Sequence, residues 1–451
     1  MQIIVVGCGK VGRTLVAQLS KENNNVTVVD TNADIVRSVS TIYDVMGVVG
    51  NGTSFATLKE AGIDDTDMVI SVTQSDEVNL LTCVIAQQKA GCHTIARVRN
   101  PIYSEESSFL RNELHLSMTI NPELEAAHEM LNLIRFPNAI EVDSFANDRI
   151  DLLRFKVPEG SAFDGVTLKE AAQKTTPDVL VCIAERGSDI TIPNGDYEIK
   201  SGDVLTIIVS PGEANHFFRQ FGVHTKKINS VMIVGGGEIT YYLTKMLIRN
   251  RIDVKIIEQN KERCVELSDH FPEVMISNAN GTDQEVLAEE HIDDMDAFVA
   301  CTGIDEINAL LSMYAQDHVR KCITKINHDS LNGIIERLNL DTIVDPKNLT
   351  AQRILQYVRA TGNSMDSNVE TLYRLMNGRV EALEFIIRPN SKLIGITLLD
   401  MKLKDNVLIA GIMRKGKLII PGGHDSFMEG DAVIVVTTHI GFDDITDILE
   451  D

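Results

Sequence analysis

The sequence carries one long pattern twice, and this repetition constrains its fold more than any other feature. A short apolar run with a glycine-rich turn occupies residues 3–12 and recurs at residues 231–240, an offset of 228. Four later landmarks recur in the same order at offsets of 228 to 229. They are Asp30 and Glu258, Asn51-Gly52-Thr53 and Asn280-Gly281-Thr282, Asp76-Glu77 and Asp305-Glu306, and Ala96-Arg97 and Thr324-Lys325. This order indicates a duplicated unit.

Each copy opens with the elements of a nucleotide-binding fold. In the first copy, an apolar run at residues 2–6 ends in the spacing G-x-G-x-x-G, an amphipathic stretch follows, and the next apolar run ends in Asp30. Gly7 permits a tight turn, Gly9 leaves room for a phosphate, and Gly12 lets the helix lie close to the strand. The helix N-terminus attracts phosphates, and the acid can accept hydrogen bonds from ribose hydroxyls. The alternative is a purely structural glycine turn.

Strands and helices continue to alternate after the first acid. The expected strands are residues 45–49, 67–72 and 93–98, and the expected helices are residues 53–61 and 77–89. Continuous apolar strands that alternate with helices predict an α/β fold with a doubly wound, Rossmann-like parallel sheet in each copy. Ligands bind at the carboxyl ends of such strands, which is where Asn51, Thr73 and Arg97 fall.

A smaller α+β module is expected after each sheet. Its landmarks recur as Gly165-Val166-Thr167-Leu168 and Gly395-Ile396-Thr397-Leu398, and as Gly202-Asp203-Val204-Leu205 and Gly430-Asp431-Ala432-Val433. The expected boundaries are 1–138 and 139–212 for the first copy, 213–228 for a linker, and 229–365 and 366–451 for the second copy.

Composition limits the class of protein. The formal net charge of −23 argues against nonspecific nucleic-acid binding and against docking on anionic lipid. The first strand starts at the N-terminus and no apolar stretch reaches transmembrane length, so we expect a cytoplasmic protein without a signal peptide. The seven cysteines show no C-x-x-C spacing, which indicates reduced core residues rather than a disulfide or zinc framework.

Several side chains outside the glycine turns are candidates for chemistry. Arg97 and Arg99 share one face of their strand, which predicts an anion clamp, with a solvated face as the alternative. Asp76 opens a helix, so favourable N-terminal charge is the simpler interpretation, although a metal-ligand role stays open. Tyr241 and Lys245 have a dehydrogenase spacing but lie directly after the glycine turn, away from any substrate. We therefore expect no catalytic residue and no metal site.

Two further helices, at about residues 122–134 and 349–358, are more apolar than one domain face needs. Each follows a predicted sheet and leads toward a small module. Docking on a partner subunit and packing within the same chain both remain open as explanations.

Taken together, these features resemble the TrkA family of bacterial and archaeal potassium uptake proteins. The resemblance covers nearly the whole chain and rests on residues 7–12, Asp30, 71–79 and 96–101. It implies two RCK units (regulator of K⁺ conductance), each a sheet domain with a small module. It also implies a homo-oligomeric ring, such as a dimer or tetramer, docked beneath a TrkH- or TrkG-type membrane subunit. NAD(H), ATP and ADP are the regulatory ligands that the resemblance implies.

Candidate ligand-binding residues occur in both copies. In the first copy they are Gly7, Cys8, Gly9, Lys10, Val11, Gly12, Asp30, Asn51, Gly52, Thr53, Thr73, Arg97 and Arg99. In the second copy they are Gly235, Gly237, Glu238, Ile239, Glu258, Asn280 and Lys325. The second copy departs from the family pattern, because Thr240 replaces the third glycine and Asn327 replaces the second arginine. We therefore expect a weaker second site.

Two other functions remain open from the sequence. An NAD-dependent oxidoreductase would need a proton donor facing the nicotinamide, and the small modules offer no convergent His, Lys, Tyr or Cys set. A free-standing sensor could bind a metabolite in its small modules. The favoured function is a nucleotide-gated regulatory subunit of potassium transport.

Overall fold

The computed structural model describes most of the chain. The described residues are 1–22, 24–104, 106–145, 150–174, 179–209, 213–220, 227–327, 338, 340, 342–363, 369–376, 379–442 and 444–450. They divide into two compact units, one formed by Met1–Leu131 with Asn229–Leu355 and the other by Asn132–Ile228 with Gln356–Asp451. The first unit holds the two sheet domains, and the second holds the two small modules.

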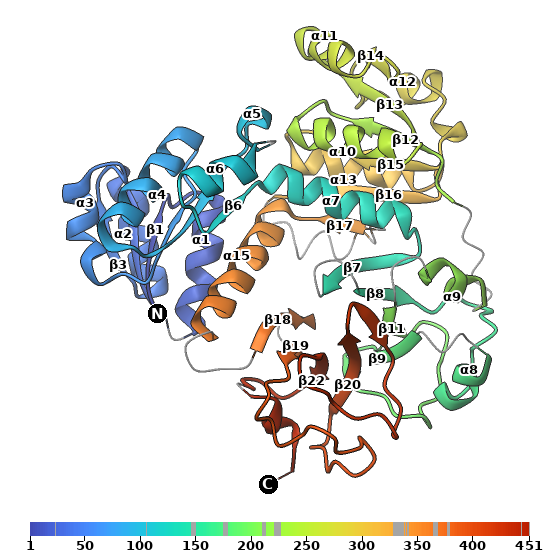
Figure 1. The fold of residues 1–451 in the computed structure, drawn as a ribbon. Coiled ribbons are helices and arrows are strands. Elements are labelled where there is room, and N and C mark those ends of the chain that lie inside the picture. The colour runs from blue at the N-terminus through green and yellow to red at the C-terminus, as the bar shows by residue number, and fades with distance from the viewer. Residues whose placement is uncertain are drawn as a thin grey trace. The chain divides into compact units, whose positions relative to one another are not determined.

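The first sheet domain is built on six parallel strands in the order β3-β2-β1-β4-β5-β6 (Figure 1). Its strands are β1 (Gln2–Val6), β2 (Asn25–Asp30), β3 (Met46–Val49), β4 (Met68–Ser71), β5 (His93–Arg97) and β6 (Met118–Ile120). Its helices are α1 (Lys10–Leu19), α2 (Ala33–Tyr43), α3 (Phe55–Glu60), α4 (Asp76–Ala90), α5 (Pro101–Ser104) and α6 (Ser107–Glu113). The strand order reverses beside β1, and right-handed crossovers then place helices on both faces of the sheet.

The second sheet domain repeats this design, with strand order β14-β13-β12-β15-β16-β17. Its strands are β12 (Ser230–Val234), β13 (Asp253–Glu258), β14 (Met275–Asn278), β15 (Ala297–Ala300), β16 (Lys321–Lys325) and β17 (Thr342–Val344). Its helices include α10 (Glu238–Arg249), α11 (Lys261–His270), α12 (Gln284–Glu289) and α13 (Asp305–Ala315). Every residue of β4 and of β15 is buried, as expected for central strands covered on both faces. The predicted α/β fold with two doubly wound parallel sheets is confirmed.

Each small module contains a five-stranded antiparallel sheet. The first has β7 (Ala139–Phe145), β8 (Ile150–Lys156), β9 (Val179–Arg186), β10 (Asp189–Thr191) and β11 (Val204–Val209), with helix α8 (Leu168–Lys174). The second has β18 (Val369–Leu375), β19 (Val380–Ile386), β20 (Val407–Arg414), β21 (Lys417–Ile419) and β22 (Ala432–Thr437). One buried apolar cluster joins them, with Leu152 and Ile208 from the first module and Val380 and Ile434 from the second. The two modules therefore share a core.

The interval 213–228, expected as a linker, contains a helix, α9 (Ala214–Gln220). Phe217 and Phe218 of this helix contact Phe155 edge to face, with ring centroids 5.9 and 5.1 Å apart. Both rings are buried. The first part of the interval therefore packs on the first small module instead of running free, and residues 221–226 lie outside the described part of the chain.

The two apolar helices that leave the sheets are α7 (Pro122–Arg135) and α15 (Pro346–Asn363). Their fully buried side chains include Met130 and Leu133 on α7 and Ile354 and Leu355 on α15. Packing within the chain thus accounts for much of the apolar face on both helices. Of the helices that the structure describes, none combines the length and the apolar character needed to cross a membrane.

Candidate functional site

The first glycine loop connects β1 to α1, and two of its glycines approach other backbone atoms closely. Gly7 has a φ of +97°, and a Cβ there would lie 2.8 Å from the backbone nitrogen of Thr73. A Cβ at Gly12 would lie 1.9 Å from the carbonyl oxygen of Gly7. Gly7 needs glycine because of its positive φ and its contact with Thr73, and a side chain at Gly12 would require the first loop and α1 to move apart. The tight turn brings the N-terminus of α1 to the carboxyl edge of the sheet.

Asp30, at the end of β2, holds the loop in place. Its Oδ2 accepts a hydrogen bond of 2.7 Å from the backbone N–H of Cys8, and its Oδ1 accepts one of 2.9 Å from Asn32. A carboxylate has about four acceptor positions, so Asp30 can still accept hydrogen bonds from a ribose. Burial and the negative charge of Asp30 raise the pKa of the Cys8 thiol to about 12, so this thiol stays neutral.

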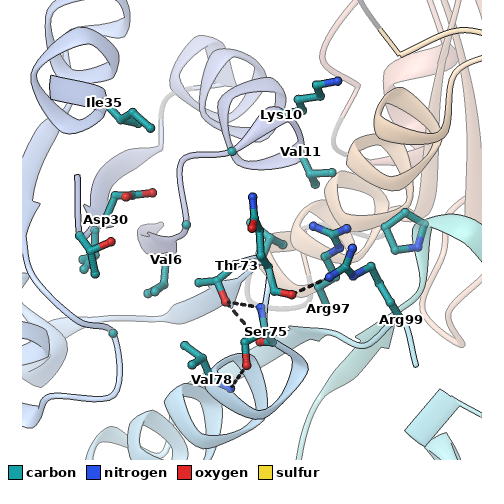
Figure 2. Close-up of a pocket in the computed structure, with 18 of the residues that line it drawn as sticks. Val6, Lys10, Val11, Asp30, Ile35, Thr73, Ser75, Val78, Arg97 and Arg99 are labelled. Atoms are coloured by element: carbon teal, nitrogen blue, oxygen red, sulfur yellow. Dashed lines mark hydrogen bonds between the residues drawn. The ribbon is translucent and has the colours of Figure 1, made fainter. Parts of the chain in front are cut away.

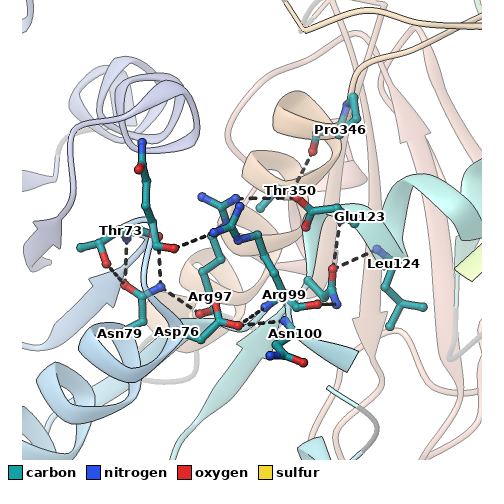
Figure 3. A network of polar contacts seen from close by, with 12 residues as sticks. Thr73, Asp76, Asn79, Arg97, Arg99, Asn100, Glu123, Leu124, Pro346 and Thr350 are labelled. Atoms are coloured by element: carbon teal, nitrogen blue, oxygen red, sulfur yellow. Dashed lines mark hydrogen bonds and ion pairs between the residues drawn. The ribbon is translucent and has the colours of Figure 1, made fainter. Parts of the chain in front are cut away.

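A buried asparagine ties together the strand ends at the centre of the edge. Asn79 on α4 accepts hydrogen bonds from the backbone N–H (2.8 Å) and the hydroxyl (2.7 Å) of Thr73. Its amide nitrogen donates 3.2 Å to the carbonyl of Thr73 and 2.9 Å to that of Arg97. The residues after β4 and at the end of β5 are therefore fixed relative to each other (Figure 3).

The predicted arginine pair lies at this edge, and each member has a protein partner. The Nη2 of Arg97 is 3.8 Å from Oε1 of Glu123, at the start of α7. The Nη2 of Arg99 donates 2.6 Å to the carbonyl of Gln74. Asp76 accepts the backbone N–H groups of Arg99 and Asn100 at 2.9 and 2.8 Å. Its carboxylate, which the sequence suggested as helix-terminal charge or a metal ligand, therefore positions the arginine segment.

Burial opposes the charges of both members of the Arg97–Glu123 pair. It lowers the pKa of Arg97, although the carboxylate of Glu123 acts in the opposite direction. It raises the pKa of Glu123, although Arg97 favours the ionised form. The Nε atoms of Arg97 and Arg99 and the Oε2 of Glu123 are buried without a hydrogen-bond partner. An anionic ligand that bonded these guanidinium groups would satisfy buried donors.

A cleft of about 850 Å³ lies along this edge (Figure 2). Its volume suits a nucleotide-sized ligand. Ten of the predicted first-copy residues line it, namely Gly7, Gly9, Lys10, Val11, Asp30, Asn51, Gly52, Thr73, Arg97 and Arg99. Figure 2 shows Asp30 at one side and the two arginines at the other, with Lys10 and Val11 on the helix between them.

Three predicted residues support the cleft without lining it. Cys8 is fully buried beneath the loop, and Gly12 lies where α1 crosses the backbone of Gly7. The hydroxyl and backbone N–H of Thr53 both donate 3.0 Å to Oδ1 of Asn51. Thr53 therefore orients the asparagine that does line the cleft.

The second copy also contributes to the first cleft, which the sequence did not predict. Asn327, Pro346 and Lys347 line it together with Glu123. Lys347 and Glu123 each follow the proline that starts a helix after the last strand of a sheet. Aligning the two copies at these prolines would have singled out both residues. Such an alignment would not show that Lys347 lines the cleft of the other copy, because that depends on the tertiary structure.

Another contact between the copies reaches the arginine segment. The hydroxyl of Tyr242 on α10 donates 3.0 Å to the carbonyl of Arg99 and accepts 3.0 Å from the side chain of Asn121. Its neighbour Tyr241, the tyrosine of the dehydrogenase-like spacing, packs against the rings of Tyr242 and Phe271. Both tyrosines therefore have structural partners.

The second glycine loop repeats the backbone of the first. Gly235 has a φ of +104°, and Oε2 of Glu258 accepts 2.6 Å from the N–H of Gly236. Thr240, in place of the third glycine, donates 2.6 Å from its hydroxyl to the carbonyl of Gly235. Asn308 accepts from Thr302 and donates 3.0 Å to the carbonyl of Lys325, as Asn79 does in the first copy.

The other second-copy candidates keep the positions of their first-copy counterparts. Asn280 accepts hydrogen bonds from Thr282, and Gly237, Glu238 and Ile239 form the start of α10. Asn327, the counterpart of Arg99, is bonded to Asp305. In the part of the chain that the structure describes, no group of three or more His, Cys, Asp or Glu side chains could hold a metal ion.

Comparison with protein families gives matches in both copies. The TrkA-N domain matches residues 3–122 and 231–346, and the TrkA-C domain matches residues 152–222 and 382–450. These matches follow the order sheet domain, small module, sheet domain, small module. They cover well over half of the chain.

Full-length relatives agree with the domain matches. The chain is 31% identical over 443 residues to the Trk system potassium uptake protein TrkA of Halomonas elongata, covering 96% of this chain and 95% of that protein. It is 29% identical over 445 residues to the protein of that name from Haemophilus influenzae, with the same coverage. These relatives are potassium uptake proteins and not oxidoreductases, so we reject the alternative function of an NAD-dependent oxidoreductase.

Solved structures show the same fold at lower identity. The GsuK channel has a TM-score of 0.65 at 16% identity, covering 97% of this chain and 76% of that chain. The crystal structure of the GsuK RCK domain has a TM-score of 0.62 at 17% identity, covering 96% and 92%. The duplicated glycine loops, the two parallel sheets with their small modules, and the full-length relatives lead to one conclusion: this chain belongs to the TrkA family of Trk system potassium uptake proteins.

Proposed function

We propose that the first cleft is a regulatory site that binds NAD(H) or an adenine nucleotide without turnover. The observation that carries this proposal is the lining of the cleft, with Asp30 at one side and Arg97 and Arg99 at the other. A carboxylate suits ribose hydroxyls, and paired guanidinium groups suit phosphates. A structural neighbour described as the GsuK channel bound to NAD (TM-score 0.64) supports this ligand class.

The family supports a role for this site in potassium transport. We infer that the chain is a nucleotide-sensing, cytoplasmic subunit that associates with a TrkH- or TrkG-type membrane subunit and gates its potassium flux. Self-assembly into a ring, as a dimer or tetramer, is part of the same proposal. The names of the full-length relatives support the transport system, and the residues of the first cleft supply the sensing step.

The geometry offers a route from ligand to assembly. The first turns of two helices line the first cleft, through Glu123 on α7 and Lys347 on α15. A ligand that binds Arg97 would compete with Glu123 for its guanidinium, and so would act on the first turn of α7. Such a ligand shifts the protein only if it binds one arrangement of these helices more tightly than the other.

Binding and turnover can be separated with one set of variants. Titration calorimetry with NADH, NAD⁺, ADP and ATP should show binding to the wild-type chain and loss of binding in Asp30→Ala. Glu258→Ala is the matched control, because it removes the equivalent carboxylate of the second copy. A steady loss of NADH absorbance in the presence of simple carbonyl or hydroxy-acid compounds would contradict binding without turnover.

The transport role needs the membrane partner. The chain should co-purify with its TrkH- or TrkG-type subunit, and nucleotide should change potassium flux in liposomes that hold both. Asp30→Ala should leave the complex intact and remove the response to nucleotide. A flux that none of the four nucleotides changes would sink the proposed sensing function, even if the complex forms.

A further inference from the structure

The glycine-loop edge of the second sheet, the counterpart of the first cleft and called the second cleft below, differs from it at one position that contacts the loop only in the second copy. Helices α2 and α11 are capped alike, by Asn32 and Asn260, whose side chains each accept two backbone hydrogen bonds. Counting from these caps, Ile35 and Arg263 are equivalent. Ile35 lines the first cleft. A long cation therefore stands in the second copy where an apolar wall residue stands in the first.

Arg263 contacts several groups around the second glycine loop, and its Nη2 is buried with an ionic partner but no hydrogen-bond partner. Its Nε donates 2.6 Å to the carbonyl of Gly236, and its Nη2 lies 3.2 Å from Oε1 of Glu238. Its Nη1 lies 2.8 Å from Oε1 of Glu266 on its own helix. The side chain is 19% exposed. The guanidinium thus links α11 to the loop and to the first residue of α10.

Glu238 occupies the end of α10 at which a phosphate would bind. The first residue of α1 is Lys10, whereas the first residue of α10 is Glu238. A helix N-terminus attracts anions through its free N–H groups and its dipole. In the second copy this helix starts with an acid, whose charge would repel a phosphate, and Arg263 forms an ion pair with its carboxylate.

The two clefts also differ in the balance of charged side chains at equivalent positions. The first cleft is lined by the cations Lys10, Arg97, Arg99 and Lys347 and by the acids Asp30 and Glu123. The equivalent positions of the second copy hold the acids Glu238 and Glu258 and the cation Lys325, to which Arg263 adds a second cation. A nucleotide with two or three negative charges meets excess positive charge in the first cleft and balanced charge in the second. An anion in either cleft competes with a carboxylate for an arginine, but only in the second does that carboxylate belong to the first residue of the helix after the glycine loop.

Arg263 also holds the second glycine loop in place through its hydrogen bond to the carbonyl of Gly236. This bond explains the position of the guanidinium and leaves its ion pair with Glu238 unchanged. In the first copy, Arg13 on α1 donates 3.1 Å to the carbonyl of Cys8. Tyr241 stands at the place of Arg13 in the second copy, so Arg263 supplies this bond to Gly236 from the opposite helix. The bond to the loop carbonyl thereby draws the guanidinium from α11 toward the loop and Glu238.

We propose that the ion pair between Arg263 and Glu238 closes the second cleft to nucleotides, so that each chain binds one nucleotide, in its first copy. The proposal rests on the function proposed for the first cleft. It assigns to the second sheet domain a role as scaffold, which lends Asn327, Pro346 and Lys347 to the first cleft.

Counting bound nucleotides tests the proposal with the full chain. Equilibrium dialysis with NADH and with ADP, at a concentration that just saturates the wild type, should give one equivalent per wild-type chain and only a small fraction of one for Asp30→Ala, whose affinity falls about thirtyfold or more. Lys10→Glu/Ile35→Arg, which gives the first cleft the pair of the second, should also bind little. Two equivalents in the wild type, or one retained in either variant, would overturn the proposal. A wild-type chain that binds no nucleotide would instead refute the proposed function of the first cleft. It would also refute the proposal that each chain binds one nucleotide.

Opening the second cleft is the complementary test. In the Asp30→Ala background, Glu238→Lys/Arg263→Ile should restore about one equivalent of ADP binding. Glu262→Lys/Arg249→Ile is the matched control, because it makes the same exchanges at exposed positions of α11 and α10 and should restore none. If Glu238→Lys/Arg263→Ile in this background has a wild-type circular dichroism spectrum but binds no ADP, the ion pair between Arg263 and Glu238 is not what closes the second cleft. If this variant does not fold, the wild-type and Asp30→Ala counts still decide.

Discussion

The two glycine-loop clefts keep the same backbone and differ in the side chains that a ligand would meet. Asp30 and Glu258 each accept the N–H of the residue that follows the first glycine of the loop, at 2.7 Å from Cys8 and 2.6 Å from Gly236. Asn79 and Asn308 both tie the centre of the edge together. These contacts are needed to fold each sheet edge, whatever binds there. Lys10 and Glu238, in contrast, carry opposite charges at the same position of the loop.

This contrast helps to separate residues that are needed for the fold from residues that could contact a ligand. A residue that is the same in both clefts can be explained by backbone geometry alone. A residue that differs, such as Arg99 against Asn327, is a candidate for contact with a ligand, whereas Arg263 also replaces a loop bond that Arg13 makes in the first copy. The sheet domains therefore contain an internal control, in which each substitution in the first copy has a matched substitution in the second.

The largest expected effect is that of the two acids on ligand binding. Both carboxylates hold a loop N–H, so Asp30→Ala and Glu258→Ala should disturb their loops alike. Only Asp30 should also lose hydrogen bonds to a ribose, which costs about 2–4 kcal/mol, or roughly thirtyfold or more in affinity. Titration calorimetry with NADH measures this loss. Equal losses of affinity in the two variants would break the comparison.

The arginine pair should sharpen the comparison by phosphate number. Arg97→Gln/Arg99→Gln should weaken ATP binding tenfold or more, because a charge-assisted contact to a terminal phosphate contributes about 1.5–3 kcal/mol. ADP and NADH should lose less. Lys325→Gln in the second copy is the matched control and should change none of the three. If the double variant weakens all three ligands by one factor, the arginines act as general electrostatics.

The small modules should behave alike where the clefts do not. Arg186 bonds Asp203 at 2.8 and 2.7 Å, and Arg414 bonds Asp431 at 2.9 and 2.7 Å, both through Nε and Nη2. Both carboxylates are 1% exposed. Asp203→Asn and Asp431→Asn should each cost about 2 kcal/mol of stability, measured as similar shifts of the urea midpoint. A large shift in only one variant would show that the modules have diverged as the clefts have.

The Asp203 pair also predicts a pH dependence. Burial alone would raise the pKa of Asp203, but hydrogen bonds from Arg186, the Lys200 N–H and Tyr197 hold it below its ordinary value of 3.8. A carboxyl group whose pKa is lowered by folding adds stability above its unfolded pKa and loses it as pH falls through the folded pKa. The cost of Asp203→Asn should therefore be full at pH 7 and shrink below about pH 4. A cost that stays constant down to pH 3 would contradict this account.

The smallest expected effect concerns the contact between the copies. Tyr242→Phe removes the hydroxyl that bonds Arg99 and Asn121, and it should cost about 1 kcal/mol of stability. Tyr241→Phe is the matched control on the same helix. Thermal unfolding of the two variants checks the difference. If both melt like the wild type, Tyr242 does not hold the arginine segment.

Much of the fold could be predicted from the sequence because its signals are local. The apolar strands, the glycine spacing, the capped helices and the repetition at 228 residues each depend on neighbours along the chain. They predicted both parallel sheets, the small modules and ten residues of the first cleft, because the carboxyl ends of parallel strands meet at one edge. The helix α9 was missed, since its seven residues form a weak periodic signal, and Phe217 and Phe218 are held by contact with Phe155.

The fold of each copy follows from local sequence patterns, whereas the contacts between the two copies depend on how their sheet domains pack. Lys347 of the second copy lines the first cleft because of how the two sheet domains pack, and no local sequence pattern encodes that packing. The sequence did show that Thr240 and Asn327 depart from the first copy. The ion pair of Arg263 with Glu238 emerged only in three dimensions, because it joins side chains 25 residues apart across the loop. Side-chain contacts between elements depend on distance in space, and that distance is set by how the elements pack and not by their spacing along the chain.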